Sequence, residues 1–154
     1  MLIYKKEGFF HCNLVSKFIN IFFFSGLKES IEKIIYFTFK FLKRKLNVKT
    51  PLFYFFECIE HLRPILGLKK KLNFFNIVKK TQYITYYLKS NKSYNIAITW
   101  FYFGIILQKK TILLQKIFNE IVNLNLFNLG ISLQKKYQHY HFCVEYKNNK
   151  NYRW

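Results

Sequence analysis

An excess of positive charge constrains this chain more than any other feature of its sequence. The 154 residues include 26 Lys and Arg against seven acidic residues, which gives a formal net charge of +19. Self-repulsion of this size destabilises a compact state unless a polyanion neutralises it. Nucleic acid and an anionic membrane are the two ordinary partners for such a charge.

The basic residues are almost all lysines. Of the 26, three are arginines (Arg44, Arg63 and Arg153) and 23 are lysines. Lysine neutralises a phosphate as a point charge, whereas dense reading of base edges favours the bidentate guanidinium. The balance predicts recognition of a nucleic-acid backbone and its shape more than of its sequence.

The composition also indicates an A/T-rich genome. Phe, Tyr, Ile, Asn and Lys make up 86 of the 154 residues, whereas Ala occurs once, at Ala97, and Pro twice. The abundant residues have A/T-rich codons, so we attribute the bias to mutational pressure, as in an organelle. The bias accounts for the 19 Phe without a functional aromatic site. Residues 1–10 start with Met and lack the pattern of a transit peptide, so we expect an organelle-encoded chain.

A membrane protein is the main structural alternative, because 51% of the residues are hydrophobic. The most apolar windows run from Phe18 to Phe24 and from Tyr94 to Leu107. A membrane-spanning helix needs about 20 predominantly apolar residues, so both windows are too short. We therefore expect buried core helices and no membrane partner.

No residue pattern predicts an enzyme, a cofactor or a metal site. The cysteines are odd in number and lack a framework spacing, which is typical of free thiols in a reducing compartment: Cys12, Cys58 and Cys143. Cys58-x-x-His61 and His139-x-His141-x-Cys143 lack the paired cysteines of a structural zinc site, so we interpret them as ordinary thiols and surface histidines. The seven scattered acids offer no paired carboxylates, and no nucleophile is paired with a base.

Apolar residues at three- and four-residue spacing predict a mainly α fold. Six helices are expected, over residues 14–24, 28–45, 51–62, 93–107, 111–124 and 133–149. In the third of them we expect Phe53, Phe56, Ile59 and Leu62 to be buried. Thr50-Pro51 provides its start, with Thr as N-cap and Pro in the first turn.

Residues 66–92 have a different character. Lysine runs at 69–71 and 79–80 flank an apolar patch, and residues 82–88 are β-prone. This pattern predicts two strands joined by a basic loop. No repeat or linker divides the chain, so we expect a single domain over 1–154, with an N-terminal arm at 1–12, a β-hairpin arm at 67–92, and a C-terminal helix and tail at 131–154.

Several short motifs occur in one collinear order along the chain: Lys17 to Asn20, Ser25 to Ser30, Ile34 to Tyr36, Thr50-Pro51-Leu52, Glu60 to Pro64, Lys80 to Ile84, Ala97 to Trp100, Asn119 to Ile121, and Lys135-Lys136. The final residues are Asn151-Tyr152-Arg153-Trp154. In this order the motifs resemble those of the small-subunit ribosomal protein seven family of bacterial type, whose members end in a similar His-Tyr-Arg-Trp. The resemblance covers about residues 13–154. It departs from the family at Leu27, where the family has Lys, and at the hairpin tip, where lysines replace an Arg-rich Gly-Gly turn.

The resemblance implies a body of about six helices with an extended β-hairpin. It implies a structural constituent of the small ribosomal subunit that binds the 3′ major domain of small-subunit rRNA, helps to organise the head and contacts neighbouring ribosomal proteins there. The hairpin and C-terminal region would lie near exit-site tRNA and the mRNA exit path. With the composition, it implies a mitochondrial ribosome, with a plastid as the alternative.

RNA binding is expected to come mainly from lysine contacts with phosphates, with release of counterions. The expected contact residues are Lys5, Lys6, Lys17, Lys28, Lys69, Lys70, Lys71, Lys79, Lys80, Lys89, Lys92, Lys109, Lys110, Lys135, Lys136, Arg153 and Trp154. An isolated lysine such as Lys116 is interpreted as part of a solvated face. Trp100 is assigned to packing. Two other function classes stay open: an RNA-binding regulator outside the ribosome, and a small organellar membrane protein.

Overall fold

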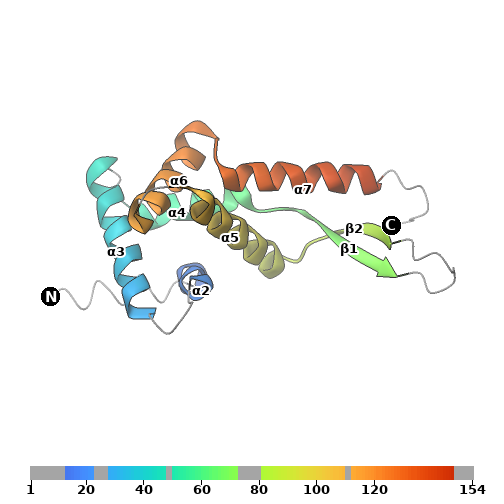
Figure 1. The fold of residues 1–154 in the computed structure, drawn as a ribbon, viewed down its shortest axis with the longest axis horizontal. Helices are drawn as coiled ribbons and strands as arrows, with labels where there is room; N and C mark the ends of the chain where they lie inside the picture. Colours follow the sequence, from blue (N-terminus) through green and yellow to red (C-terminus); the bar gives the residue numbers. More distant parts are fainter. Residues whose placement is uncertain (1–12, 23–27, 48–49, 73–80, 110–111, 148–154) are drawn as a thin grey trace.

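The helices and strands of the computed structural model follow the order expected from the sequence. The structure describes residues 13–22, 28–47, 50–72, 81–109 and 112–147. Within these ranges it contains six helices and two strands: α2 (Asn13–Ile21), α3 (Lys28–Lys45), α4 (Pro51–Leu62), β1 (Leu66–Leu72), β2 (Thr81–Tyr87), α5 (Ser90–Leu107), α6 (Leu113–Phe127) and α7 (Ile131–Lys147). The prediction of a mainly α fold with a β-hairpin is confirmed (Figure 1).

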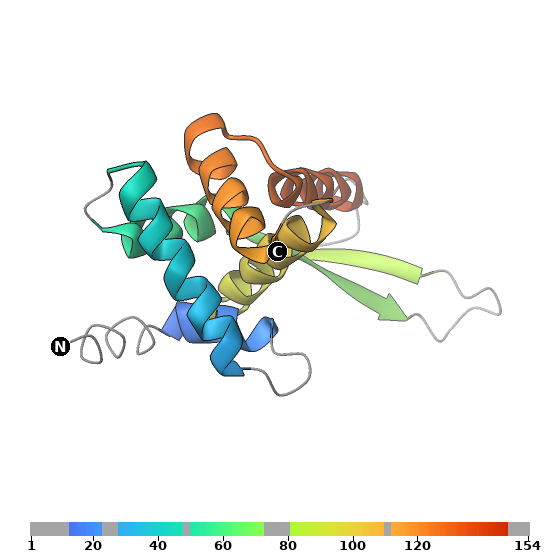
Figure 2. The same cartoon turned by 60° about the vertical axis from the view of Figure 1, so that its left-hand side comes forward.

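The hairpin projects from one end of the helical body, and α3 lies at the other end (Figure 1). The projection is also clear after a 60° rotation (Figure 2). The two strands pair antiparallel, from Leu66 opposite Tyr87 to Leu72 opposite Thr81. Helix α7 contacts both strands, so the arm is supported where it leaves the body.

The core is built around three buried phenylalanines from three helices. Phe18 of α2, Phe55 of α4 and Phe101 of α5 are fully buried. Their ring centroids are 5.3, 5.4 and 5.9 Å apart in tilted and edge-on arrangements, the geometry that aromatic pairs prefer. The expected burial of Phe53 is wrong, because its side chain is 60% exposed. The buried residues of α4 are Pro51, Phe55, Cys58, Ile59 and Leu62, at three- and four-residue spacing, which leaves Phe53 on the opposite side.

Some element boundaries differ from the expected ones. Helix α5 begins at Ser90 instead of Ser93, so residues 90–92 of the expected hairpin arm form the first helical turn. A tertiary contact explains why Ser93 is not the start of the helix. Ser93 is buried, and its hydroxyl donates a 2.5 Å hydrogen bond to the carbonyl of Pro64. Ser93 therefore fixes α5 to the end of α4, and it does not cap the helix.

We expect Ser93→Ala to lower the free energy of unfolding by about 1–2 kcal/mol, because the buried Pro64 carbonyl loses its hydroxyl donor. Urea unfolding followed by circular dichroism measures this change. Ser90→Ala is the matched control in the same helical turn, since Ser90 is exposed, and it should change stability by less than about 0.5 kcal/mol. Equal effects of the two substitutions would contradict the role given to Ser93.

A buried carboxylate joins α5, α6 and α7. Glu120 of α6 is 1% exposed. Its Oε1 accepts hydrogen bonds from the backbone N–H of Ser132, at 3.1 Å, and from the hydroxyl of the same residue. Its Oε2 accepts a 2.7 Å hydrogen bond from Nε2 of Gln108. Ser132 lies in the first turn of α7, where the positive end of the helix dipole favours an anion, so the start of α7 is fixed against the rest of the body.

Candidate RNA-binding surface

The lysines of β1 are divided between the two faces of the hairpin, because successive strand residues point to opposite sides. Lys69 lies opposite Ile84, and Lys70 lies opposite Tyr83. Opposed residues of an antiparallel pair share a face. Lys69 and Lys70 are both exposed, so the arm presents positive charge on both sides.

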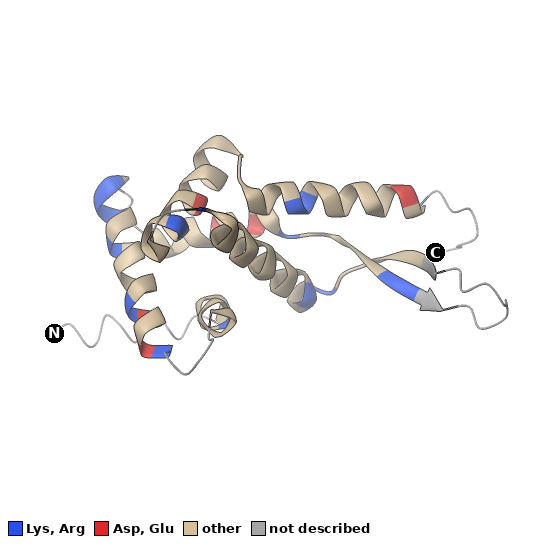
Figure 3. Ribbon diagram, viewed as in Figure 1, with Lys and Arg blue, Asp and Glu red and all other residues tan. Residues whose placement is uncertain are grey.

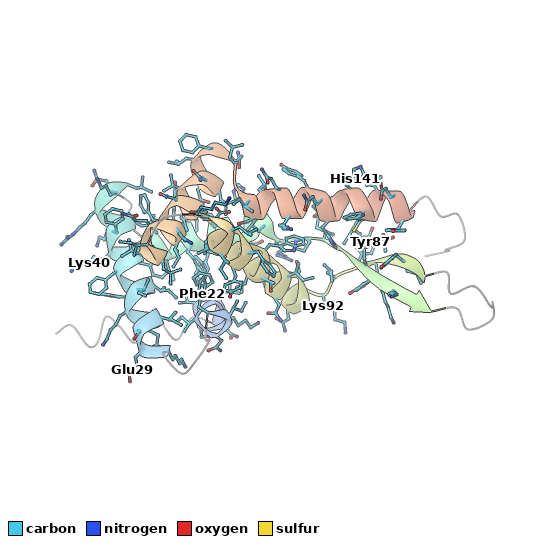
Figure 4. All side chains as sticks on the ribbon, viewed as in Figure 1. Phe22, Glu29, Lys40, Tyr87, Lys92 and His141 are labelled. Atoms are coloured by element: carbon cyan, nitrogen blue, oxygen red, sulfur yellow. The ribbon has the colours of Figure 1, made fainter. Side chains whose placement is uncertain are left out.

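The face of Lys69 continues onto the first turn of α5. Tyr86 lies two residues beyond Ile84 and therefore shares this face. Nζ of Lys92 donates a 2.6 Å hydrogen bond to the hydroxyl of Tyr86 and lies 5.2 Å from the centroid of its ring. Figure 4 labels Lys92 at the point where α5 meets the hairpin. Lys69, Ile84, Tyr86 and Lys92 thus form a surface of cations and aromatic carbon, which we call the basic hairpin face.

The opposite face of the hairpin is turned towards α7. The ring of Tyr83 packs against that of Tyr146, with centroids 4.9 Å apart. Thr85, which shares the face of Tyr83, is buried. Lys70 therefore lies at the edge of the interface between the hairpin and α7, whereas Lys69 lies on the opposite, open face of the hairpin.

Hydrogen bonds from α7 hold the base of the arm. A ring nitrogen of His139 lies 2.8 Å from the carbonyl oxygen of Leu66, and the backbone N–H of Ile65 donates to the hydroxyl of Tyr140 at 3.2 Å. The indole of Trp100 packs 5.2 Å from the His139 ring, consistent with the packing role expected for it. The direction of the arm is thus set by side chains of α7 and α5.

The two neighbouring lysines of α7 have different environments. Lys135 is exposed, whereas Lys136 is partly buried. Nζ of Lys136 donates to the carbonyl of His61 and lies 5.9 Å from the ring centroid of Tyr140. Burial lowers the pKa of the Lys136 amine, because a desolvated ammonium is less stable than a hydrated one.

Helices α2 and α3, which carry two of the lysines expected to bind RNA, lie on the side of the body away from β1 and β2 (Figures 1 and 2). Lys17 is partly buried on α2, and Lys28 is exposed at the start of α3. Nζ of Lys28 lies 4.0 Å from the carboxylate of Glu32. An exposed pair of this length contributes little to stability, so Lys28 stays available to a phosphate.

The positions of the expected contact residues fall into four groups. Those with exposed side chains are Lys28, Lys69, Lys70, Lys89, Lys92, Lys109 and Lys135, and those with partly buried side chains are Lys17 and Lys136. Lys71 lies in β1 and is described by its backbone alone. The others lie outside the described residues: Lys5, Lys6, Lys79, Lys80, Lys110, Arg153 and Trp154.

A second basic cluster was not among the expected contacts. Four exposed cations occupy the last two turns of α3: Lys40, Lys43, Arg44 and Lys45. Figure 3 shows this cluster at the end of the molecule opposite the basic strand, and Figure 4 labels Lys40 there. The sequence signal was present as a K-x-x-K-R-K run, but cations in a last helical turn are also explained by the helix dipole.

The described residues give no support to the other chemistries considered. No group of three or more His, Cys, Asp or Glu side chains that could hold a metal occurs among them. Cys58 is buried and donates to the carbonyl of Ile121 and to Oδ1 of Asn125, and burial raises the pKa of its thiol. In the same residue ranges, every helix is too short or too polar to cross a membrane.

Comparison with known proteins identifies relatives along almost the whole chain. Residues 2–144 match the model of the family described as ribosomal protein S7p/S5e. The chain is 29% identical over 141 residues to small ribosomal subunit protein uS7 of Wigglesworthia glossinidia brevipalpis, covering 92% of this chain and 86% of that one. It is 23% identical over 158 residues to small ribosomal subunit protein uS7m of Reclinomonas americana, covering 99% and 96%. It is also 25% identical over 141 residues to the uS7 of Sulfurimonas denitrificans, covering 92% and 87%.

Proposed function

Because the chain belongs to the ribosomal protein S7p/S5e family, we propose that it is a structural constituent of the small ribosomal subunit and binds the 3′ major domain of the rRNA there. The observation that carries this proposal is the family match over residues 2–144, combined with exposed lysines on the hairpin, α3, α5 and α7. Folded rRNA supplies the polyanion that a net charge of +19 requires. No catalytic role is proposed.

The division of the basic residues supports binding to folded RNA over binding to one short strand. The cluster at the end of α3 lies at one end of the molecule, whereas the basic hairpin face extends from the start of α5 along β1 towards the other end (Figures 3 and 4). A protein that contacts phosphates at two separate patches reads the arrangement of an RNA fold, because phosphate contacts fix position without reading sequence.

The projection of the arm supports a second part of the proposal, which is a partner other than rRNA on the head of the subunit. With the body on rRNA, the hairpin lies next to exit-site tRNA and the mRNA exit path, and other faces of the body meet neighbouring ribosomal proteins of the head. The support is the projection of β1 and β2 away from the helices (Figure 2), together with the exposed cations on the arm.

The ribosome to which the chain belongs is proposed to be mitochondrial. The composition indicates an A/T-rich genome, and the similar uS7m of Reclinomonas americana is described as a mitochondrial-type protein by its name. The bacterial relatives are as similar, and a plastid ribosome is the alternative. Immunodetection in gradient-purified organelles separates these locations, since enrichment with plastid ribosomes would exclude the mitochondrial one.

Cosedimentation tests the ribosomal function against the two other classes. The protein is expected to sediment with small subunits at moderate salt, whereas a regulator outside the ribosome would stay in lighter fractions. Carbonate extraction tests the membrane alternative, since retention in the pellet would favour it. A protein that stays in light fractions would overturn the proposal.

Removing charge from the basic hairpin face should weaken RNA binding more than removing the same charge elsewhere. We expect Lys69→Gln with Lys92→Gln to lower affinity for the 3′ major domain about 10- to 100-fold near 100 mM salt, and to reduce the slope of log affinity against log salt by about 2, one unit per lost phosphate contact. Filter binding between about 50 and 200 mM KCl measures both quantities.

The matched control is Lys33→Gln with Lys116→Gln, which removes the same charge from α3 and α6. It is expected to change affinity less than about threefold, since only the general electrostatic attraction is reduced. If both pairs weaken binding equally, net charge alone carries the interaction, and the basic hairpin face is not a contact surface.

A further inference from the structure

A pocket of about 420 Å³ lies where the end of α4, the base of the hairpin, the first turn of α5 and α7 meet. A volume of this size falls within the range of ligand-binding sites. Its lining includes two cations, one carboxylate, one aromatic ring and two apolar side chains: Arg63, Lys136, Glu60, Tyr140, Pro64 and Leu88. The sequence predicted Lys136 as a phosphate contact but did not predict a pocket beside it.

Arg63 is held in place in the wall of this pocket. Its Nη1 lies 3.2 Å from Oε2 of Glu60 and 3.3 Å from the hydroxyl of Tyr94, and its guanidinium lies 4.8 Å from the centroid of the Tyr94 ring. The Tyr94 hydroxyl also donates to the carboxylate of Glu60, which raises the pKa of the phenol. A guanidinium has five N–H donors, so further donors stay available to a ligand.

Lys136 of α7 provides a second cation to the lining of the pocket. An ammonium has three donors, and among the described residues the hydrogen bond of Nζ is to the carbonyl of His61. The remaining donors can bind an anion. A partly desolvated ammonium gains more from an anionic ligand than an exposed one does, because less hydration is lost when the ligand arrives.

Tyr140 gives the pocket an aromatic wall in a fixed position. Its hydroxyl accepts the hydrogen bond from the backbone N–H of Ile65, so the ring is anchored at the base of the arm. Pro64 and Leu88 add apolar surface. A flat ring beside apolar side chains is the type of surface on which an unpaired base stacks.

We propose that this pocket binds one unpaired RNA nucleotide, with its phosphate at Arg63 and Lys136 and its base against Tyr140. The Glu60 carboxylate can accept a hydrogen bond from an N–H group of the base, as carboxylates do from exposed base edges. The same carboxylate disfavours a free phosphate or an acidic side chain next to it, because the like charges repel each other, whereas a base is uncharged and offers N–H donors. This inference rests on the proposed function, because it assumes that the polyanion bound by the chain is RNA.

The experiment compares three RNA hairpins of equal length: one with a single unpaired nucleotide, one with an abasic ribose at that position, and one fully paired. Each of the four bases is tested at the unpaired position with the full-length protein. We expect at least one base to bind about 5- to 10-fold more tightly than the abasic RNA, the effect of one base stacked on an aromatic ring. In the Tyr140→Leu variant, the ratio of the affinity for the RNA with the unpaired base to the affinity for the abasic RNA should fall to about 1.

Matched variants separate this site from general effects. Tyr137 lies on the same helix and is 63% exposed, so Tyr137→Leu should keep the wild-type ratio, and Tyr140→Phe should keep it because the ring remains. Lys136→Met should weaken binding of the unpaired RNA at least threefold more than Lys135→Met. Circular dichroism identifies variants that do not fold, and if Tyr140→Leu is one of them, the comparison of Lys136→Met with Lys135→Met decides the test, because equal effects would overturn the pocket.

Two failures can be distinguished. A ratio near 1 for all four bases in the wild type, or an unchanged ratio in Tyr140→Leu, overturns the nucleotide pocket while binding to the 3′ major domain stands. Loss of preference for that rRNA over unrelated RNA of equal length overturns the proposed function itself.

Discussion

Glu120→Ala is expected to lower the free energy of unfolding by about 3–5 kcal/mol, because several donors in the interior lose their acceptor at once. The carboxylate is 1% exposed and is bonded to the backbone and hydroxyl of Ser132 and to the amide of Gln108. Each donor left unsatisfied in the interior costs about 1–3 kcal/mol. Urea unfolding of the purified protein measures the change.

Two substitutions provide the controls. Glu120→Gln keeps an acceptor oxygen for Ser132, so we expect a loss of about 1–2 kcal/mol. Glu145→Ala removes an exposed carboxylate near the end of α7, which pairs with His141 at the surface, and should change stability by less than about 0.5 kcal/mol. If Glu120→Ala is no worse than Glu145→Ala, Glu120 does not hold the three helices together.

Gly104→Ala is expected to cost about 2–4 kcal/mol, although alanine favours a helix interior over glycine by about 1 kcal/mol. A Cβ atom at this position of α5 would overlap Oγ of Ser132 and lie 2.6 Å from Oε1 of Glu120. Both atoms are fixed by their mutual hydrogen bond, so α7 must move away from α5. Thermal and urea unfolding measure the loss.

The control for Gly104→Ala is Asn95→Ala, an exposed position of the same helix, which should lie within about 0.5 kcal/mol of the wild type. In the double variant Gly104→Ala with Glu120→Ala, the loss of unfolding free energy should be at least about 1 kcal/mol smaller than the sum of the two single losses. The reason is that the carboxylate that obstructs the new Cβ atom is gone. Additive effects would show that the glycine and the carboxylate do not share one site.

These two substitutions also bear on RNA binding, because the Glu120 cluster positions the start of α7. The same helix carries Lys135, Lys136 and Tyr140 and supports the base of the hairpin. A shift of α7 would therefore move the arm and change the pocket beside Lys136. Variants of Glu120 and Gly104 that still fold should lose affinity for RNA without losing any positive charge.

The helices could be predicted from the sequence because their buried faces are continuous. The stripe of α3, which includes Ile35 and Leu42, is buried as its spacing indicates. In α4, several phenylalanines made two helical phases almost equally apolar, so the exposed Phe53 was assigned to the core. Codon bias that places phenylalanine on both faces of a helix removes the contrast on which periodicity depends.

The Glu120 cluster could not be predicted, because its partners come from separate parts of the chain. A single glutamate among polar positions of a helix is ordinarily a solvated residue. Gln108 and Ser132 lie 12 residues away on either side, and the tertiary fold alone brings them together. The same holds for the start of α5, which depends on the contact between Ser93 and Pro64.

The candidate binding surface was predictable in its chemistry but not in its arrangement. Runs of lysine indicated phosphate contacts at the hairpin and at residues 135–136. The sequence could not show that Lys135 is exposed while Lys136 is partly buried against the carbonyl of His61, because neighbouring positions on a helix differ by about 100°. It also did not distinguish the basic end of α3 from an ordinary helix terminus.

Crosslinking in intact organelles, followed by mapping of the RNA attached to this protein, tests the central claim most directly. If the lysine excess is neutralised by small-subunit rRNA, most crosslinks should fall in its 3′ major domain, and peptides from the hairpin and α7 should carry them. A main signal in other RNAs, or peptides crosslinked to lipid in place of RNA, would contradict it.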